Sequence, residues 1–111
     1  MNTTKTYGGW TTYETWIVKL WMDEDEGSYT YWNEQAEQAY AEAEADSVFT
    51  RIERATYDLA DILEIEVKDG VPDLGDCIYG DLLSAALSQV NWSEIAASLI
   101  EEVDKAEAIE R

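Results

Sequence analysis

Apolar residues recur three and four positions apart along most of this chain, and this spacing limits the possible folds more than any other feature. In an α-helix it gathers apolar side chains into one stripe, whereas a half-buried strand requires alternation. The one alternating run, Glu64–Val67, is too short to outweigh the helical pattern that leads into it. The sequence therefore predicts an all-α protein.

The first predicted helix runs from about residue 12 to residue 22. Thr11 and Glu14 have the spacing of a capping box, in which each side chain bonds the backbone N–H of the other residue. The stripe that follows consists of Tyr13, Trp16, Ile17 and Leu20. Gly27 is the predicted stop, after an acidic run at 23–26. Negative charge at a helix C-terminus opposes the macrodipole, so helix stability explains this run poorly.

Two further helices are predicted with little between them. Ser28 can cap the second helix. Its stripe is Tyr29, Trp32, Ala36, Ala39, Tyr40 and Ala43. Asp46 and Ser47 are predicted to cap a third helix that ends near residue 66. Its stripe is Val48, Ile52, Ala55, Leu59, Ile62 and Leu63. Arg54 and Asp58 stand four residues apart and predict an ion pair that compensates charge on this helix.

The clearest connection is the segment 69–75, which contains the only proline. The fourth predicted helix then carries Ile78, Leu82, Leu83, Ala86, Leu87 and Val90. Asn91 and Glu94 form another capping box that opens a fifth helix. Its predicted buried face is Ile95, Leu99, Ile100 and Val103. We expect residues 1–10 to form a loose arm and residues 11–111 to form a single compact domain of four or five helices with an aromatic-rich core.

The chain has enough apolar material for one such core. Its 111 residues are 46% hydrophobic and include five Trp and seven Tyr. Trp21 lies at the edge of its stripe and Tyr31 points away from its own, so both are candidates for exposed contact anchors. Cys77 is expected to be buried beside Ile78. The first residues lack the apolar segment of a signal peptide and no run is long enough to cross a membrane, so we expect a cytoplasmic protein.

The net charge of the chain limits which partners it can bind. Asp and Glu number 25 against seven Lys and Arg, which gives a formal net charge of −18 at pH 7. This exceeds what solubility requires, and the self-repulsion destabilises the compact state. Direct binding to nucleic acid or to an anionic membrane is disfavoured, because both are polyanions. The charge instead predicts a basic partner.

The acids are concentrated in one block. From Leu20 to Thr50 there is no Lys or Arg, but there are nine acids: Asp23, Glu24, Asp25, Glu26, Glu34, Glu37, Glu42, Glu44 and Asp46. On the second helix, Glu37 and Glu44 are predicted to lie two turns apart along one flank with Glu34 close by, and Glu42 and Asp46 along the other. A carboxylate at every turn is one charge per roughly 5 Å, the same order as one phosphate per roughly 3.4 Å of a DNA strand. We predict that these nine residues bind the partner.

Composition argues against most catalytic sites. There is no histidine, and the single Cys77 can neither hold zinc nor form an internal disulfide. Gly8-Gly9 lacks the surroundings of a phosphate-binding loop. Asp23 and Asp25 superficially fit a calcium loop, but Gly27 falls at its fifth position rather than its sixth. A carboxylate metal enzyme is the catalytic alternative left, and chance proximity among 25 acids weakens it. We expect no enzyme, no cofactor and no metal site.

Two groups of residues form a recognisable pattern. The first is Tyr13-Glu14-Thr15-Trp16, Leu20-Trp21, Asp23, Asp25-Glu26-Gly27 and Tyr31-Trp32. The second is Pro72, Leu74, Asp81-Leu82-Leu83, Ala85-Ala86-Leu87, Val90-Asn91-Trp92 and Glu94-Ile95-Ala96. Together they resemble a family of small proteins of unknown function found in phages, plasmids and bacterial genomes. The resemblance implies a shared aromatic core and shared helix caps rather than a catalytic set.

Small size, excess acid and this resemblance together predict a binding protein. We expect an acidic domain of a mobile element that mimics DNA and inhibits a basic, nucleic-acid-binding host defence protein of restriction or CRISPR type. The alternative is a non-enzymatic structural or adaptor module whose acidity serves solubility or a saline cytoplasm. The sequence leaves the identity of the target and a homo-oligomeric state open.

Overall fold

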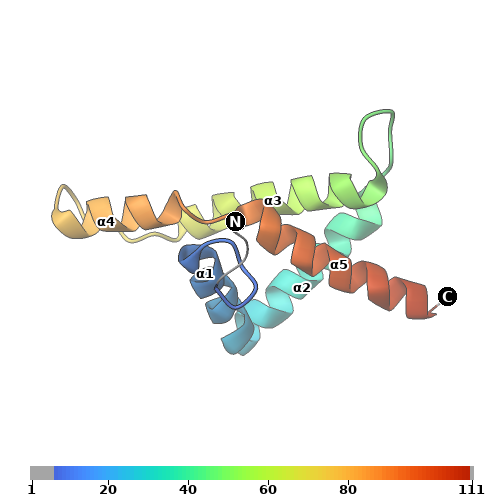
Figure 1. Cartoon of the computed structure of the whole chain (residues 1–111), viewed down its shortest axis with the longest axis horizontal. Helices are drawn as coiled ribbons and strands as arrows, with labels where there is room; N and C mark the ends of the chain where they lie inside the picture. The colour runs from blue at the N-terminus through green and yellow to red at the C-terminus, as the bar shows by residue number, and fades with distance from the viewer. Residues whose placement is uncertain (1–6, 111) are drawn as a thin grey trace, which may run out of the picture.

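Five helices make up the regular structure of residues 7–110, which are the residues that the computed structural model describes. They are α1 (Tyr13–Glu24), α2 (Glu26–Glu42), α3 (Arg51–Asp69), α4 (Ile78–Leu87) and α5 (Trp92–Glu110), shown in Figure 1. No strand forms among these residues, which confirms the predicted all-α class. None of the five helices combines the length and the apolar content that crossing a bilayer requires.

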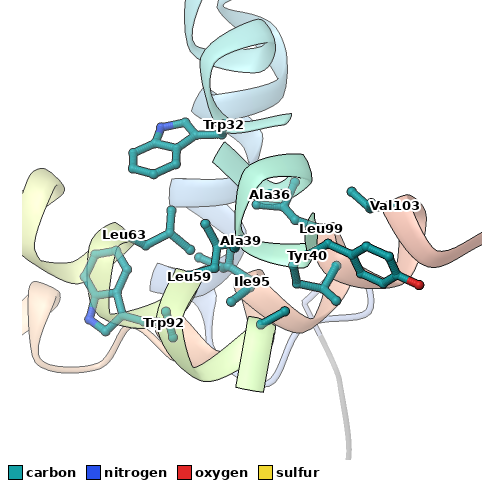
Figure 2. Close-up of a cluster of buried hydrophobic side chains, with 14 of the residues drawn as sticks. Trp32, Ala36, Ala39, Tyr40, Leu59, Leu63, Trp92, Ile95, Leu99 and Val103 are labelled. Carbon is teal, nitrogen blue, oxygen red and sulfur yellow. The ribbon is translucent and has the colours of Figure 1, made fainter. Parts of the chain in front are cut away.

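The core lies where α5 packs against α2 and α3, with α1 joined to it through α2 (Figure 1). Its largest fully buried apolar side chains are Leu59, Leu63, Ile95 and Ile100. Fully buried alanines at Ala36, Ala55 and Ala96 let the helices approach closely, since protein interiors tolerate few voids. The aromatic members of the core are Trp32, Tyr40 and Trp92, which Figure 2 shows around the aliphatic side chains.

The chain enters α1 through a tight turn. Tyr7 and Trp10 exchange two backbone hydrogen bonds of 3.2 and 2.9 Å, and Trp10 packs against the core. Gly8 and Gly9 between them have φ values of 59° and 94°, which glycine adopts without steric cost. The remainder of the predicted loose arm, residues 1–6, lies outside the described residues.

Three threonines attach the start of α1 to the turn before α5. Thr12, not Thr11, caps α1, because the Thr12 hydroxyl accepts a hydrogen bond from the Thr15 backbone N–H. Thr11 instead donates its hydroxyl to Glu94 at 2.8 Å, so the predicted box between Thr11 and Glu14 is wrong. The buried Thr15 hydroxyl accepts from the Asn91 backbone N–H at 2.8 Å. Residues far apart in the sequence thereby fix α1 on α5.

Asp25 ends α1 and begins α2. Its backbone N–H donates to Trp21, and its carboxylate accepts a 2.8 Å hydrogen bond from the Ser28 backbone N–H. The predicted stop at Gly27 and cap at Ser28 are therefore wrong, since both residues lie inside α2. Glu26, in the first turn of α2, has a favourable position relative to the helix dipole. The start of α2 thus explains Asp25 and Glu26, whereas Asp23 and Glu24 lie in the last turn of α1.

The connection between α2 and α3 is longer than predicted. Thr50 caps α3 in a complete capping box with Glu53, so the predicted cap at Asp46 and Ser47 is wrong. Asp46 caps the preceding turn, accepting from the backbone N–H groups of residues 48 and 49 at 2.8 and 2.7 Å. Val48 was expected in the core but is 75% exposed, because it lies in this connection.

Arg51 links α3 back to α2. Its Nε and Nη2 donate to the Tyr40 carbonyl at 3.0 and 2.8 Å, and its guanidinium lies 4.1 Å from the centre of the Tyr40 ring. The last turn of α2 contains no basic residue of its own. Arg51 therefore supplies the positive charge that a helix C-terminus favours.

The fourth helix departs most from the prediction. None of its residues is buried, and Figure 1 shows α4 at one end of the long axis, away from the core. The radius of gyration is 15.4 Å, above the ~13 Å expected for a compact chain of this length. Cys77, which was expected to be buried, is exposed. Of the predicted stripe, Val90, which lies beyond the helix, is buried in the core, and Leu87, at the end of the helix, is half-buried against the core.

Candidate functional site

All nine carboxylates predicted to bind a partner are exposed to solvent. We call them the acidic surface. Two lie in the last turn of α1, one at the corner, four on α2 and two in the connection to α3. In this order they are Asp23, Glu24, Asp25, Glu26, Glu34, Glu37, Glu42, Glu44 and Asp46. The structure thus brings them onto consecutive elements, although not onto one continuous helix.

Three of these carboxylates already have partners within the chain. Asp23 pairs with Lys19 at 2.7 Å. The Ser28 backbone N–H, aided by the Ser28 side chain, lowers the pKa of Asp25. The backbone N–H groups of residues 49 and 48 lower the pKa of Asp46, and Arg54, 3.3 Å away, lowers it further. These three groups therefore stabilise the chain's own turns and helix ends.

The other six carboxylates form no ion pair within residues 7–110. Glu42 accepts a hydrogen bond from Gln38 at 3.0 Å. Within residues 7–110, no Lys or Arg forms an ion pair with Glu24, Glu26, Glu34, Glu37 or Glu44. Successive rotation by 100° places Glu26, Glu34 and Glu37 on the side of α2 opposite its buried alanines. Since α2 ends at Glu42, the prediction that Glu37 and Glu44 share a helical flank is wrong, and Glu44 lies in the connection.

The third helix shows the opposite pattern. Lys68 contacts Glu64 at 2.6 Å, and Arg54 lies 3.9 Å from Asp58, each pair one turn apart. The predicted charge compensation on this helix is confirmed. α3 therefore compensates part of its acid with ion pairs, whereas the carboxylates of α2 form no ion pair within residues 7–110.

Both aromatic residues proposed as contact anchors are exposed, but only one has an unengaged side chain. Trp21 is 70% exposed, one turn before Asp25. Tyr31 donates its hydroxyl to the Glu66 carboxylate at 2.7 Å, and this contact raises the pKa of Tyr31. We therefore regard Trp21 as the aromatic anchor beside the acidic surface.

An open cleft of about 520 Å³ lies elsewhere, between the start of α1, α3 and the turn before α5. Polar side chains including Thr11, Asp61, Glu64 and Asn91 line it. Sequence reasoning missed this cleft, because its walls come from segments that only the tertiary fold brings together. Among the described residues, no group of three Cys, Asp or Glu is placed to hold a metal ion.

The comparisons with known proteins identify a family. Residues 3–108 match a family of unknown function, DUF7249. The chain belongs to this family. No curated protein and no solved structure shows significant similarity to the chain. Membership of DUF7249 covers nearly the whole chain and assigns no activity to the acidic surface.

Proposed function

We propose that this chain is an acidic protein-binding domain that mimics DNA and inhibits a basic, nucleic-acid-binding defence protein of its host, of restriction or CRISPR type. The observation that carries the proposal is the exposed, unpaired acid of α2, at Glu26, Glu34 and Glu37. A surface of unpaired carboxylates attracts the lysines and arginines with which such proteins bind phosphate.

The dimensions of α2 suit this role. Its 17 residues extend about 25 Å, and Glu26 and Glu37 stand roughly 16 Å apart along the axis. Phosphates on one DNA strand are spaced roughly 3.4 Å apart, so α2 presents charge over the length of several nucleotides. The length of α2 therefore matches that of a protein groove that binds several nucleotides of a DNA strand.

Trp21 adds a contact that charge alone does not provide. Its exposed indole lies one turn before Glu24 and Asp25, so an arginine attracted by these carboxylates can meet the face of the ring. Cation–π contacts contribute about 0.5–2 kcal/mol, and tryptophan is among the residues that dominate interface energies. The combination favours a protein partner that is rich in arginine.

Mobile elements often encode small acidic proteins that resemble DNA electrostatically and block defence proteins. The resemblance to proteins of phages and plasmids supports this class of function for the present chain. It is an analogy of class and not of individual residues.

A second reading is that the chain is a structural or adaptor module whose acidity only maintains solubility. It is favoured by the distribution of unpaired acid, since Glu102 and Glu107 on α5 are also exposed and have no ion pair within residues 7–110. In that case no region of the surface is a dedicated binding site.

Charge reversal separates the two readings. The immobilised chain captures proteins from host lysate, and double-stranded DNA is then added to test whether it displaces them. In a second assay, the chain is added to the captured proteins to test whether they lose their DNA binding. The triple variant Glu34→Lys, Glu37→Lys, Glu44→Lys should weaken capture by more than about tenfold. The domain should stay folded, because all three side chains are exposed. Binding of the unaltered chain should also weaken as salt rises.

The matched control is Asp61→Lys, Glu102→Lys, Glu107→Lys, which changes the net charge equally at exposed positions that form no ion pair within residues 7–110. Equal losses in the two triple variants would show that only total charge matters. If double-stranded DNA does not displace the captured proteins, the result would contradict DNA mimicry and support the adaptor reading.

A further inference from the structure

The exposed face of α4 is apolar. Ile78, Tyr79 and Leu82 are 66%, 70% and 60% exposed, and Ala85 is exposed one turn further on. Ile78, Leu82 and Ala85 follow the spacing i, i+4 and i+7, so they form one stripe along the helix. We call these four residues the α4 stripe. It contains no charged side chain.

The chain itself covers only the opposite face of α4. The segment 71–76 lies against that face, where a Cβ at Gly80 would stand 2.8 Å from the Gly75 carbonyl oxygen. Leu83 and Leu87, on the same side, line a hollow shared with the segment 71–76. Successive rotation by 100° places Ile78 and Leu82 away from this contact. The α4 stripe is therefore left over after α4 has made its contacts within the chain.

A helix like α4 needs a second surface. It has ten residues and no side-chain cap at Cys77. Isolated helices shorter than about 12–15 residues are marginal in water, and most helical stability comes from burying an apolar face. A surface that covers this face would stabilise the helix. A second copy of the same chain can supply that cover without a further partner, because it is present wherever the protein is.

The area of the stripe agrees with this occupant. Its large side chains expose on the order of 500 Å², and monomers rarely expose contiguous apolar patches above a few hundred Å². Two such stripes packed together bury about 1,000 Å², which is the threshold for a specific interface. The second copy brings an identical stripe, as a two-fold interface requires.

Charge is also compatible with a second copy. Asp81 is the only charged residue of α4. Figure 1 shows α4 and the connection between α2 and α3 at opposite ends of the molecule, so pairing through α4 keeps most of the acidic surface away from the contact. Repulsion at longer range is screened within about 8 Å at 0.15 M salt. A partner selected by positive charge has no reason to choose the α4 stripe.

We propose that the chain forms a two-fold dimer in which the α4 stripes of two copies pack against each other in antiparallel orientation. With the axis near Leu82, Ile78 faces the partner's Ala85, so a large side chain meets a small one. This proposal does not depend on the proposed function.

Sedimentation equilibrium of the full chain tests the proposal. We expect a dimer at micromolar concentration that is strengthened by salt, because screening reduces repulsion between two acidic chains. Leu82→Glu should raise the dissociation constant by more than about tenfold. Val48→Glu adds the same charge at an exposed site in the α2–α3 connection and should leave the dimer intact. A monomeric unaltered chain, or equal losses in both variants, would overturn the proposal.

Cross-linking checks the contact without adding a charge. In a Cys77→Ala background, Leu82→Cys should form an intermolecular disulfide much faster than Val48→Cys, because the two-fold axis brings residue 82 of both copies together. Circular dichroism verifies that each variant remains helical. Equal rates would place any dimer contact elsewhere and overturn the proposal.

Discussion

α4 and α5 are neighbours in the chain, but the apolar face of α4 is exposed and that of α5 is buried. Both carry apolar residues at helical spacing, and the turn at residues 88–91 separates them. The stripe of α5 is buried throughout: Ile95, Leu99, Ile100 and Val103 all belong to the core. The stripe of α4 is exposed. Apolar spacing therefore identifies a helix and its apolar face, but it does not show which element covers that face.

Topology makes the difference. α5 packs against two helices, α2 and α3, whose buried alanines at Ala36 and Ala55 leave room for its large side chains. α4 follows a connection that begins after α3 has ended, and its cover within the chain is the segment 71–76. Burial of a helix thus depends on which elements the connections bring beside it.

The largest expected effect contrasts one substitution in two places. Leu63→Ala in the core should destabilise the domain by about 2–5 kcal/mol, because it leaves a cavity among fully buried side chains. Leu82→Ala on α4 should change the stability of the monomer by no more than about 0.5 kcal/mol. Urea unfolding measures both, at a concentration where sedimentation shows monomers. If Leu82→Ala greatly lowers the free energy of unfolding under those conditions, the Leu82 side chain packs against the core of the same chain.

Local signals made most of the fold predictable from the sequence. The existence of the fourth helix and the side-chain cap from Asn91 to the Glu94 backbone N–H were predicted, since spacing and capping involve residues close in the chain, although α4 ends at Leu87, before the predicted Val90. The capping box of Thr50 and Glu53 has the same local spacing, but Asp46 is an equally favourable N-cap residue and stands earlier in the chain. Gly27 misled because glycine is a common helix stop, and it is tolerated here in the first turn of α2.

The acidic surface was only partly predictable. Exposure of Glu34 and Glu37 followed from helical periodicity. The roles of Asp25 and Asp46 as caps did not, because an acidic run looks the same whether its members bind a partner or the backbone. The contact of Arg51 with the Tyr40 carbonyl requires two helices to meet, which no local pattern specifies.

An intermediate effect concerns the missing cap of α4. Cys77 has the extended backbone of a helix N-cap, but its side chain makes no capping hydrogen bond. Cys77→Ser introduces a hydroxyl that favours this position and should stabilise α4 by about 0.5–1 kcal/mol. Hydrogen exchange should slow at the amides of α4 and not at those of α5. Unchanged exchange at α4 would show that the contacts of α4 already fix it and would weaken the contrast between the two helices.

The smallest expected effect is a pH dependence confined to the capped corners of α2 and α3. Hydrogen bonds lower the pKa values of Asp25 and Asp46, so the unfolded chain binds these protons more readily than the folded one. Their contribution to stability is present above the ordinary pKa of 3.8 and is lost as pH falls through the lower folded values.

Release of charge repulsion at acid pH acts in the opposite direction across the whole chain, so the effect must be measured as a difference between variants. The stability gap between the unaltered chain and Asp25→Asn should be constant above about pH 5 and shrink below it. Glu37→Gln also removes one acidic charge, at an exposed side chain that makes no hydrogen bond within residues 7–110. A gap that narrows equally for both variants would trace the effect to net charge rather than to the cap at the α1–α2 corner.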